Sequence, residues 1–121
     1  MHIELDIFSG RPNPSWELTP AESASFLQQL RALPRAGAGQ PEEGLGYRGL
    51  IVTGTAGALI DSFTTVVVSG GLVVGQHPQG GTQTWLDTGR SLERWLARTG
   101  KPHLDPDIYT QVTQALQRRP I

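Results

Sequence analysis

The chain has 121 residues, of which 37% are hydrophobic and 17% charged, a composition that predicts a globular protein with one domain over residues 1–121. Ten Lys and Arg residues against eleven Asp and Glu give a net charge of -1, which argues against the strongly basic surface of a nucleic-acid-binding protein. The chain holds no cysteine, which excludes disulfide bridges, thiolate metal sites and thiol nucleophiles.

Nothing in the sequence predicts a targeting or membrane segment. Glu4 and Asp6 are acidic where a signal peptide has a basic and then an apolar run. The apolar stretches are about five residues long, whereas a membrane-spanning helix needs roughly 20. We therefore expect a cytoplasmic protein that binds neither a membrane nor a nucleic acid.

The first third of the chain predicts a strand, a stiff loop and a helix. Residues 3–7 alternate apolar and acidic side chains, the pattern of a strand with one buried face. Residues 9–14 contain two prolines, which fix the backbone and lack an N–H donor, so we expect a stiff loop. Thr19 is suited to cap a helix that has Pro20 in its first position, and Pro34 ends this helix.

The middle of the chain predicts a loop and three strands. Residues 35–46 are rich in glycine and carry two glutamates, so we expect a mobile loop there. Residues 49–53 form the second predicted strand. Residues 64–69 and 72–74 are rich in valine and flank the glycines at 70–71, a pattern that predicts a hairpin with a two-residue turn.

The predicted hairpin carries apolar side chains on both of its faces. Val66, Val68 and Val73 share one face, and Val67 shares the other with Val74 and Leu72. Three helices cover one face of a small sheet but hardly both. The second face is therefore expected to be covered either by a second copy of the chain or a partner, or by the long segment 35–62.

The last third of the chain predicts two helices. Asp87 or Thr88 caps the first of them, and Gly100 is suited to the position after its end. Asp105 caps the second, with Pro106 in the first helical position. The element order is then β-α-β-β-β-α-α, in which the strands are grouped. This order predicts an α+β fold of two layers, with about four mostly antiparallel strands and three helices.

The proline-stiffened loop is the most unusual candidate for a binding surface. Arg11 is suited to grip a carboxylate or phosphate, and Asn13 and Trp16 add an amide and an indole on the same rigid backbone. An alternative is structural: Arg11 pairs with Asp6 or Asp87, Asn13 closes a turn, and Trp16 packs into the core.

Tyr47 and Arg48 are the second group of candidate contact residues. They follow a glycine-rich stretch at 44–46, which precedes a predicted strand, whereas phosphate-binding glycine loops open a helix. A nucleotide site is therefore not expected. These two side chains either line a small groove beside the mobile loop or, for Tyr47, cover the edge of the sheet.

No residue pattern predicts a metal, a cofactor or a catalytic group. The histidines at positions 2, 77 and 103 lack the spacing of a metal motif, and no nucleophile elbow is present. Glu4 and Asp6 share a strand face and read as solvated carboxylates. Arg90, Arg94 and Arg98 recur every four residues, which predicts either a surface that docks an acidic partner or a solvated helix face.

These features predict a small non-enzymatic binding module. Its expected contact residues are Arg11, Asn13, Trp16, Tyr47 and Arg48, and its partner is a protein or a small ligand. The alternative is a small enzyme that clamps an anionic small molecule with Arg11 and uses a carboxylate or His77 as acid and base. A third hypothesis is a homodimer in which a second copy completes the apolar face of the sheet.

Overall fold

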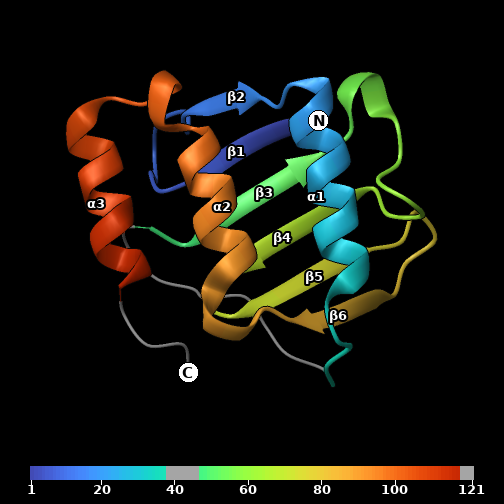
Figure 1. Cartoon of the computed structure of the whole chain (residues 1–121). Helices are drawn as coiled ribbons and strands as arrows, with labels where there is room; N and C mark the ends of the chain where they lie inside the picture. Colours follow the sequence, from blue (N-terminus) through green and yellow to red (C-terminus); the bar gives the residue numbers. More distant parts are fainter. Residues whose placement is uncertain (38–46, 118–121) are drawn as a thin grey trace.

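A six-stranded antiparallel sheet and three α-helices make up the structure, a computed structural model that describes residues 1–37 and 47–117. All three helices lie on one face of the sheet (Figure 1). The fold is therefore α+β, as the grouped strands predict. The strand order is β2-β1-β3-β4-β5-β6. The bounds are His2–Asp6 (β1), Ser15–Glu17 (β2), Pro20–Ala32 (α1), Gly49–Thr53 (β3), Thr65–Ser69 (β4), Leu72–Gln76 (β5), Thr82–Leu86 (β6), Ser91–Thr99 (α2) and Pro106–Leu116 (α3).

The sheet has six strands where the sequence predicts about four, because β2 and β6 are missed. Strand β2 is only three residues long, too short for an alternating pattern to show. Strand β6 reads Thr-Gln-Thr-Trp-Leu, and its polar residues hide the alternation although Thr84 is buried. Both strands lie at the edges of the sheet.

Part of the predicted loop 35–46 is attached to the sheet. Arg35 forms an isolated bridge with Trp85, and the Ala36 N–H donates to Thr84 O at 2.9 Å. This short pairing covers the outer edge of β6. Residues 38–46 lie outside the described residues, so the predicted mobility of that segment stays a prediction.

The hairpin forms in the predicted register. Ser69 pairs with Leu72, and Val67 pairs with Val74. Gly70 and Gly71 have φ values of 63° and 91°, the left-handed region that this two-residue turn requires.

The core lies between the sheet and the helices. It contains the inward-facing residues of every strand together with one stripe of each helix. Its fully buried members, none more than 1% exposed, include Ile3, Leu5, Leu50, Val52, Val66, Val68 and Val73 from the strands, and Phe26, Leu30, Leu92, Leu96 and Val112 from the helices.

Alternate strand residues face away from the helices. Glu4, Ile51, Val67, Val74 and Thr84 are direct neighbours in one row across this face. The three apolar members of the row are only partly buried. The hairpin is thus apolar on both faces, as its sequence predicts.

The predicted capping residues act at two helix starts. Thr19 and Glu22 form the capping box of α1, with Pro20 in its first turn. The Asp105 side chain accepts a hydrogen bond from the Asp107 N–H at the start of α3. Within residues 1–37 and 47–117, no helix combines the length and the apolar character needed to cross a membrane.

Candidate functional site

Asn13 holds the loop between β1 and β2 in a fixed shape. Its Oδ1 atom accepts hydrogen bonds from the backbone N–H groups of Ile7 at 3.1 Å and of Phe8 at 2.8 Å. Its Nδ2 atom donates to Glu4 Oε2 at 2.9 Å. Asn13 therefore closes the loop from inside. This is the structural alternative that the sequence offers for Asn13 beside a role in binding.

The Arg11 guanidinium stacks on the ring of Phe8. The guanidinium carbon lies 3.7 Å from the ring centroid, a cation–π contact. Phe8 is itself held on both sides of its Cα atom, because its N–H donates to Asn13 and its carbonyl accepts from Arg48 Nη2 at 2.9 Å. In the part of the chain that the structure describes, no residue accepts a hydrogen bond from Arg11 or forms an ion pair with it.

Asp6 and Asp87, the two acids expected as structural partners of Arg11, bind other groups. Asp6 accepts hydrogen bonds from Arg48, at 3.2 Å from Nε and 2.8 Å from Nη2, and this contact raises the pKa of the Arg48 guanidinium. Asp87 accepts from the backbone N–H groups of Leu92 and Glu93. Since Arg48 binds both Asp6 and the Phe8 carbonyl, it braces the loop, and its side chain stays 20% exposed.

Trp16 is part of the core. Its Nε1 atom donates to Thr99 Oγ1 at 3.0 Å, which joins β2 to the last turn of α2. Gly100 packs flat against the indole, and a Cβ atom there would lie 2.5 Å from Trp16 Cη2. A larger residue at position 100 would therefore displace the ring. Trp16 therefore anchors the strand that follows the loop, and its own side chain is buried.

Tyr47 belongs to a buried polar network at the end of the sheet where β4 meets β5. Its hydroxyl donates to Glu93 Oε2 at 2.5 Å. Arg90 donates to both oxygens of the same carboxylate, at 2.8 and 3.0 Å, and the Gly70 N–H donates to Oε1 at 3.0 Å. Arg90 Nη1 reaches Ala115 O at 3.3 Å. The network therefore connects β3, the hairpin turn, α2 and α3.

Asp87 completes this network below the start of α2. It accepts from the N–H groups of Leu92 at 2.9 Å and of Glu93 at 3.1 Å, so it satisfies two donors of the first helical turn. Burial raises the pKa of the Asp87 carboxyl, and the two backbone hydrogen bonds oppose this shift. No buried side-chain polar atom among residues 1–37 and 47–117 lacks a hydrogen-bond partner.

His77 and Arg11 lie near opposite ends of the sheet. His77 follows Gln76, which the strand register places in the same row as His2. Arg11 lies beyond Asp6, and Asp6 is separated from His2 by four residues of β1, about 14 Å at the usual rise of a strand. The fold therefore does not bring the arginine and the histidine of the enzyme hypothesis to one site.

A groove of about 240 Å³ lies between α2 and α3. Arg94 and Arg98 line one wall, and Tyr109 and Thr113 line the other. Of the predicted row of three arginines, Arg94 and Arg98 line the groove, whereas Arg90 is buried in the network with Glu93. The sequence does not predict the groove, because the pairing of α2 with α3 is a tertiary contact. The polar spacing of Tyr109 and Thr113, four residues apart, is the local signal that points to their shared face.

No metal centre is apparent in the described chain, where no three His, Asp or Glu side chains lie close enough to hold an ion. Comparison of the sequence and the structure with protein-family models, curated proteins and solved structures finds no match.

Proposed function

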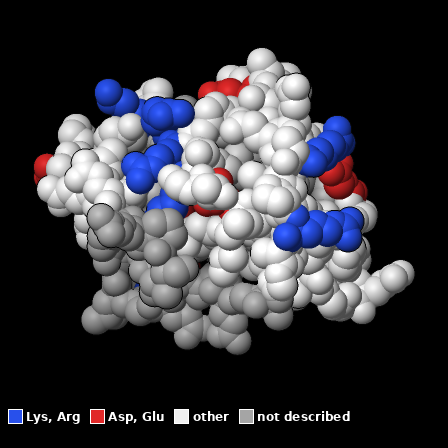
Figure 2. All heavy atoms as spheres, turned by 60° about the horizontal axis from the view of Figure 1, so that its bottom comes forward, with Lys and Arg blue, Asp and Glu red and all other residues white. Residues whose placement is uncertain are grey.

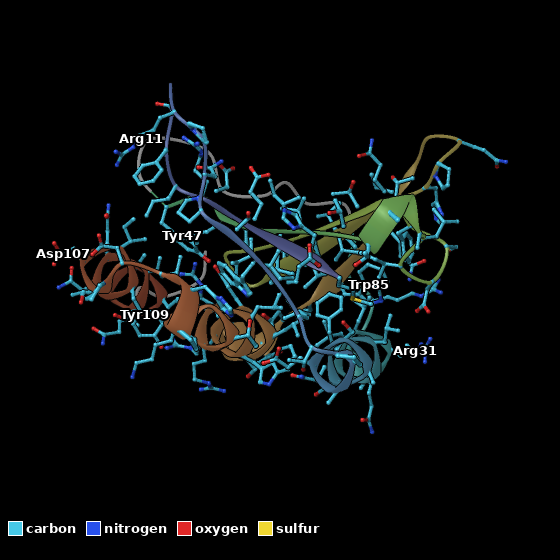
Figure 3. The ribbon with its side chains drawn as sticks, turned by 90° about the horizontal axis from the view of Figure 1, so that it is seen from above. Arg11, Arg31, Tyr47, Trp85, Asp107 and Tyr109 are labelled. Carbon is cyan, nitrogen blue, oxygen red and sulfur yellow. The ribbon has the colours of Figure 1, made fainter. Side chains whose placement is uncertain are left out.

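We propose that this chain is a non-enzymatic binding module that holds an anionic group of a protein partner or a small ligand at the Arg11–Phe8 platform. The single observation that carries the proposal is the exposed Arg11 guanidinium, stacked on the ring of Phe8, a residue whose backbone is held by hydrogen bonds. A charged group that served the fold would be expected to pair with a carboxylate. In Figure 3, Arg11 lies at the loop, away from the helices.

The stacking favours recognition of a carboxylate or a phosphate. The N–H groups of a guanidinium lie in its plane, so an aromatic ring on its face leaves them open, and two of them can bind two oxygens of an anion side by side. The anchored loop has already lost its conformational entropy, so binding costs less. In this proposal Arg11 and Arg48 contact the partner, and Asn13, Trp16 and Tyr47 hold them in place.

A titration followed by NMR tests this proposal with the full chain. We expect succinate and inorganic phosphate to shift the Arg11 Nε–Hε signal together with the backbone amides of Gly10 and Arg11. Arg11→Ala abolishes these shifts, whereas Arg11→Lys reduces them, because an ammonium lacks the planar pair of donors. A segment of the protein partner is then expected to displace the bound anion and to reverse these shifts.

The matched control is Arg35→Ala, which removes an exposed arginine from the edge of β6. This variant should leave the loop signals unchanged. If neither anion moves the loop signals in the unmodified chain, the proposal is wrong. The cytoplasmic location belongs to the same proposal and is tested by fractionating cells that express the chain.

A further inference from the structure

We infer that the groove between α2 and α3 is a second binding site, which takes an extended acidic segment of a protein partner. The groove is separate from the platform: Figure 3 shows Tyr109 on the helix side of the sheet and Arg11 beyond the opposite side. The inference therefore does not rest on the function proposed above.

The charge of the groove is the first argument. Among the described residues that line it, Arg94 and Arg98 are cationic and none is acidic. Glu93, the acid next to Arg94, is fully buried and points into the network with Arg90. Figure 2 shows Lys and Arg atoms gathered in a band on this side of the molecule. The overall charge of -1 hides this local positive surface.

The two arginines of the groove have N–H groups that a ligand can reach. Arg94 Nε donates to Gly89 O at 3.1 Å, which orients the side chain and leaves its terminal nitrogens to a ligand. Arg98 is exposed one turn further along α2. In the described chain, neither guanidinium forms an ion pair.

The opposite wall offers neutral hydrogen-bonding groups. The Tyr109 ring also has the Lys101 Nζ atom 5.7 Å from its centroid, although Lys101 itself does not line the groove. The Tyr109 hydroxyl has no partner within the described part of the chain. Thr113 Oγ1 donates to Thr110 O at 2.9 Å and keeps its lone pairs for a donor. Asp107 lies on the outer side of α3, away from Tyr109 (Figure 3).

The spacing of the arginines favours an extended acidic peptide over a single small anion. Four residues of an α-helix span about 6 Å along the axis. Side chains on one face of an extended chain repeat about every 7 Å. Two carboxylates at alternate positions of a peptide therefore match Arg94 and Arg98, while Ala97 and Leu116 supply an apolar floor between the walls.

Fluorescence anisotropy with the full chain tests the inference. The probe is a short labelled peptide with Asp at alternate positions. We expect binding that weakens with added salt. Arg98→Ala and Arg94→Ala should each weaken it about tenfold, the effect of one lost charge-assisted hydrogen bond. Tyr109→Phe should weaken it less. The melting temperature of the Arg98 variant, whose side chain is exposed, should stay unchanged.

Controls separate this site from general attraction and from the platform. The same peptide with Asn for Asp should not bind, and one with its two Asp residues adjacent should bind more weakly. Arg11→Ala should bind the alternating peptide as well as the unmodified chain does. The inference is wrong if Arg11→Ala is as damaging as Arg98→Ala. It is also wrong if inorganic phosphate or a single-stranded oligonucleotide competes as well as the acidic peptide.

Discussion

The hydroxyl of Tyr47 donates a hydrogen bond to the carboxylate of Glu93, 46 residues further along the chain, and both side chains are at least 96% buried. This contact fixes the entry of β3 to the buried face of α2. Since Glu93 also accepts from Arg90 and from the Gly70 N–H, one carboxylate joins the strand, the hairpin turn and two segments of the helix layer.

Tyr47→Phe should lower the free energy of unfolding by about 1–3 kcal/mol, because it leaves a buried carboxylate oxygen short of one donor. Urea unfolding at neutral pH measures the loss. The matched control is Tyr109→Phe, whose hydroxyl lies at the open groove and should cost less than about 0.5 kcal/mol. Equal losses in the two variants would contradict the role of Tyr47.

Arg90→Ala should be more damaging still, with a loss of about 3–5 kcal/mol, because Glu93 is left buried without its counter-charge. Unfolding followed by circular dichroism measures it. The double variant with Glu93→Leu should recover part of the loss by removing the stranded charge. If the double variant is as unstable as the sum of the single changes, the pair acts through packing rather than through charge.

The raised pKa of Asp87 predicts the sign of one pH effect. Between its unfolded pKa, near 3.9, and its raised folded pKa, the folded chain binds the proton more tightly than the unfolded chain. The contribution of Asp87 to stability is therefore greatest below that range and is lost as the pH rises through it. The stability difference between the unmodified chain and Asp87→Asn should decline in the same direction. A difference that grows with pH would show that the two helix N–H groups outweigh burial.

Self-association through the open face of the sheet is a further prediction. Val67, Val74 and Ile51 lie only partly buried on that face, and Leu86 is 44% exposed at its edge. Sedimentation equilibrium at micromolar concentration should show a dimer that Val74→Asp dissociates without unfolding the chain. Val73→Asp is the matched control, since Val73 faces the core and its substitution should unfold the chain. A monomer of 13.1 kDa in the unmodified chain would exclude the homodimer.

Local signals predicted the elements whose ends depend on neighbouring residues. Thr19 with Pro20, Asp105 with Pro106, and the two hairpin glycines each determine a helix start or a turn from within a few residues. The expectation that Asp87 or Thr88 is the N-cap of α2 was wrong in position, because Arg90 precedes the helix. Asp87 still satisfies the first helical turn, through the N–H groups five and six residues later.

Features that depend on distant residues could not be predicted in the same way. The indole of Trp16 reaches Thr99, 83 residues away, and Tyr47 reaches Glu93. No local pattern distinguishes such a buried aromatic residue from an exposed one on a binding loop. The contact of Arg11 is local, with Phe8 three residues earlier, yet the neighbouring sequence did not indicate it. Nor did it indicate that the Arg11 N–H groups are unpaired among the described residues.

The melting temperature of Arg11→Ala, measured beside that of Asn13→Ala, tests the central claim most directly. If Arg11 is held out for a partner, its loss removes one exposed cation–π contact, worth about 0.5–1 kcal/mol, and the melting temperature falls by roughly 2–4 °C. Asn13→Ala strands two backbone donors and should cost about 1–3 kcal/mol. A fall for Arg11→Ala as large as that for Asn13→Ala would show that Arg11 serves the fold, and would remove the platform as a binding site.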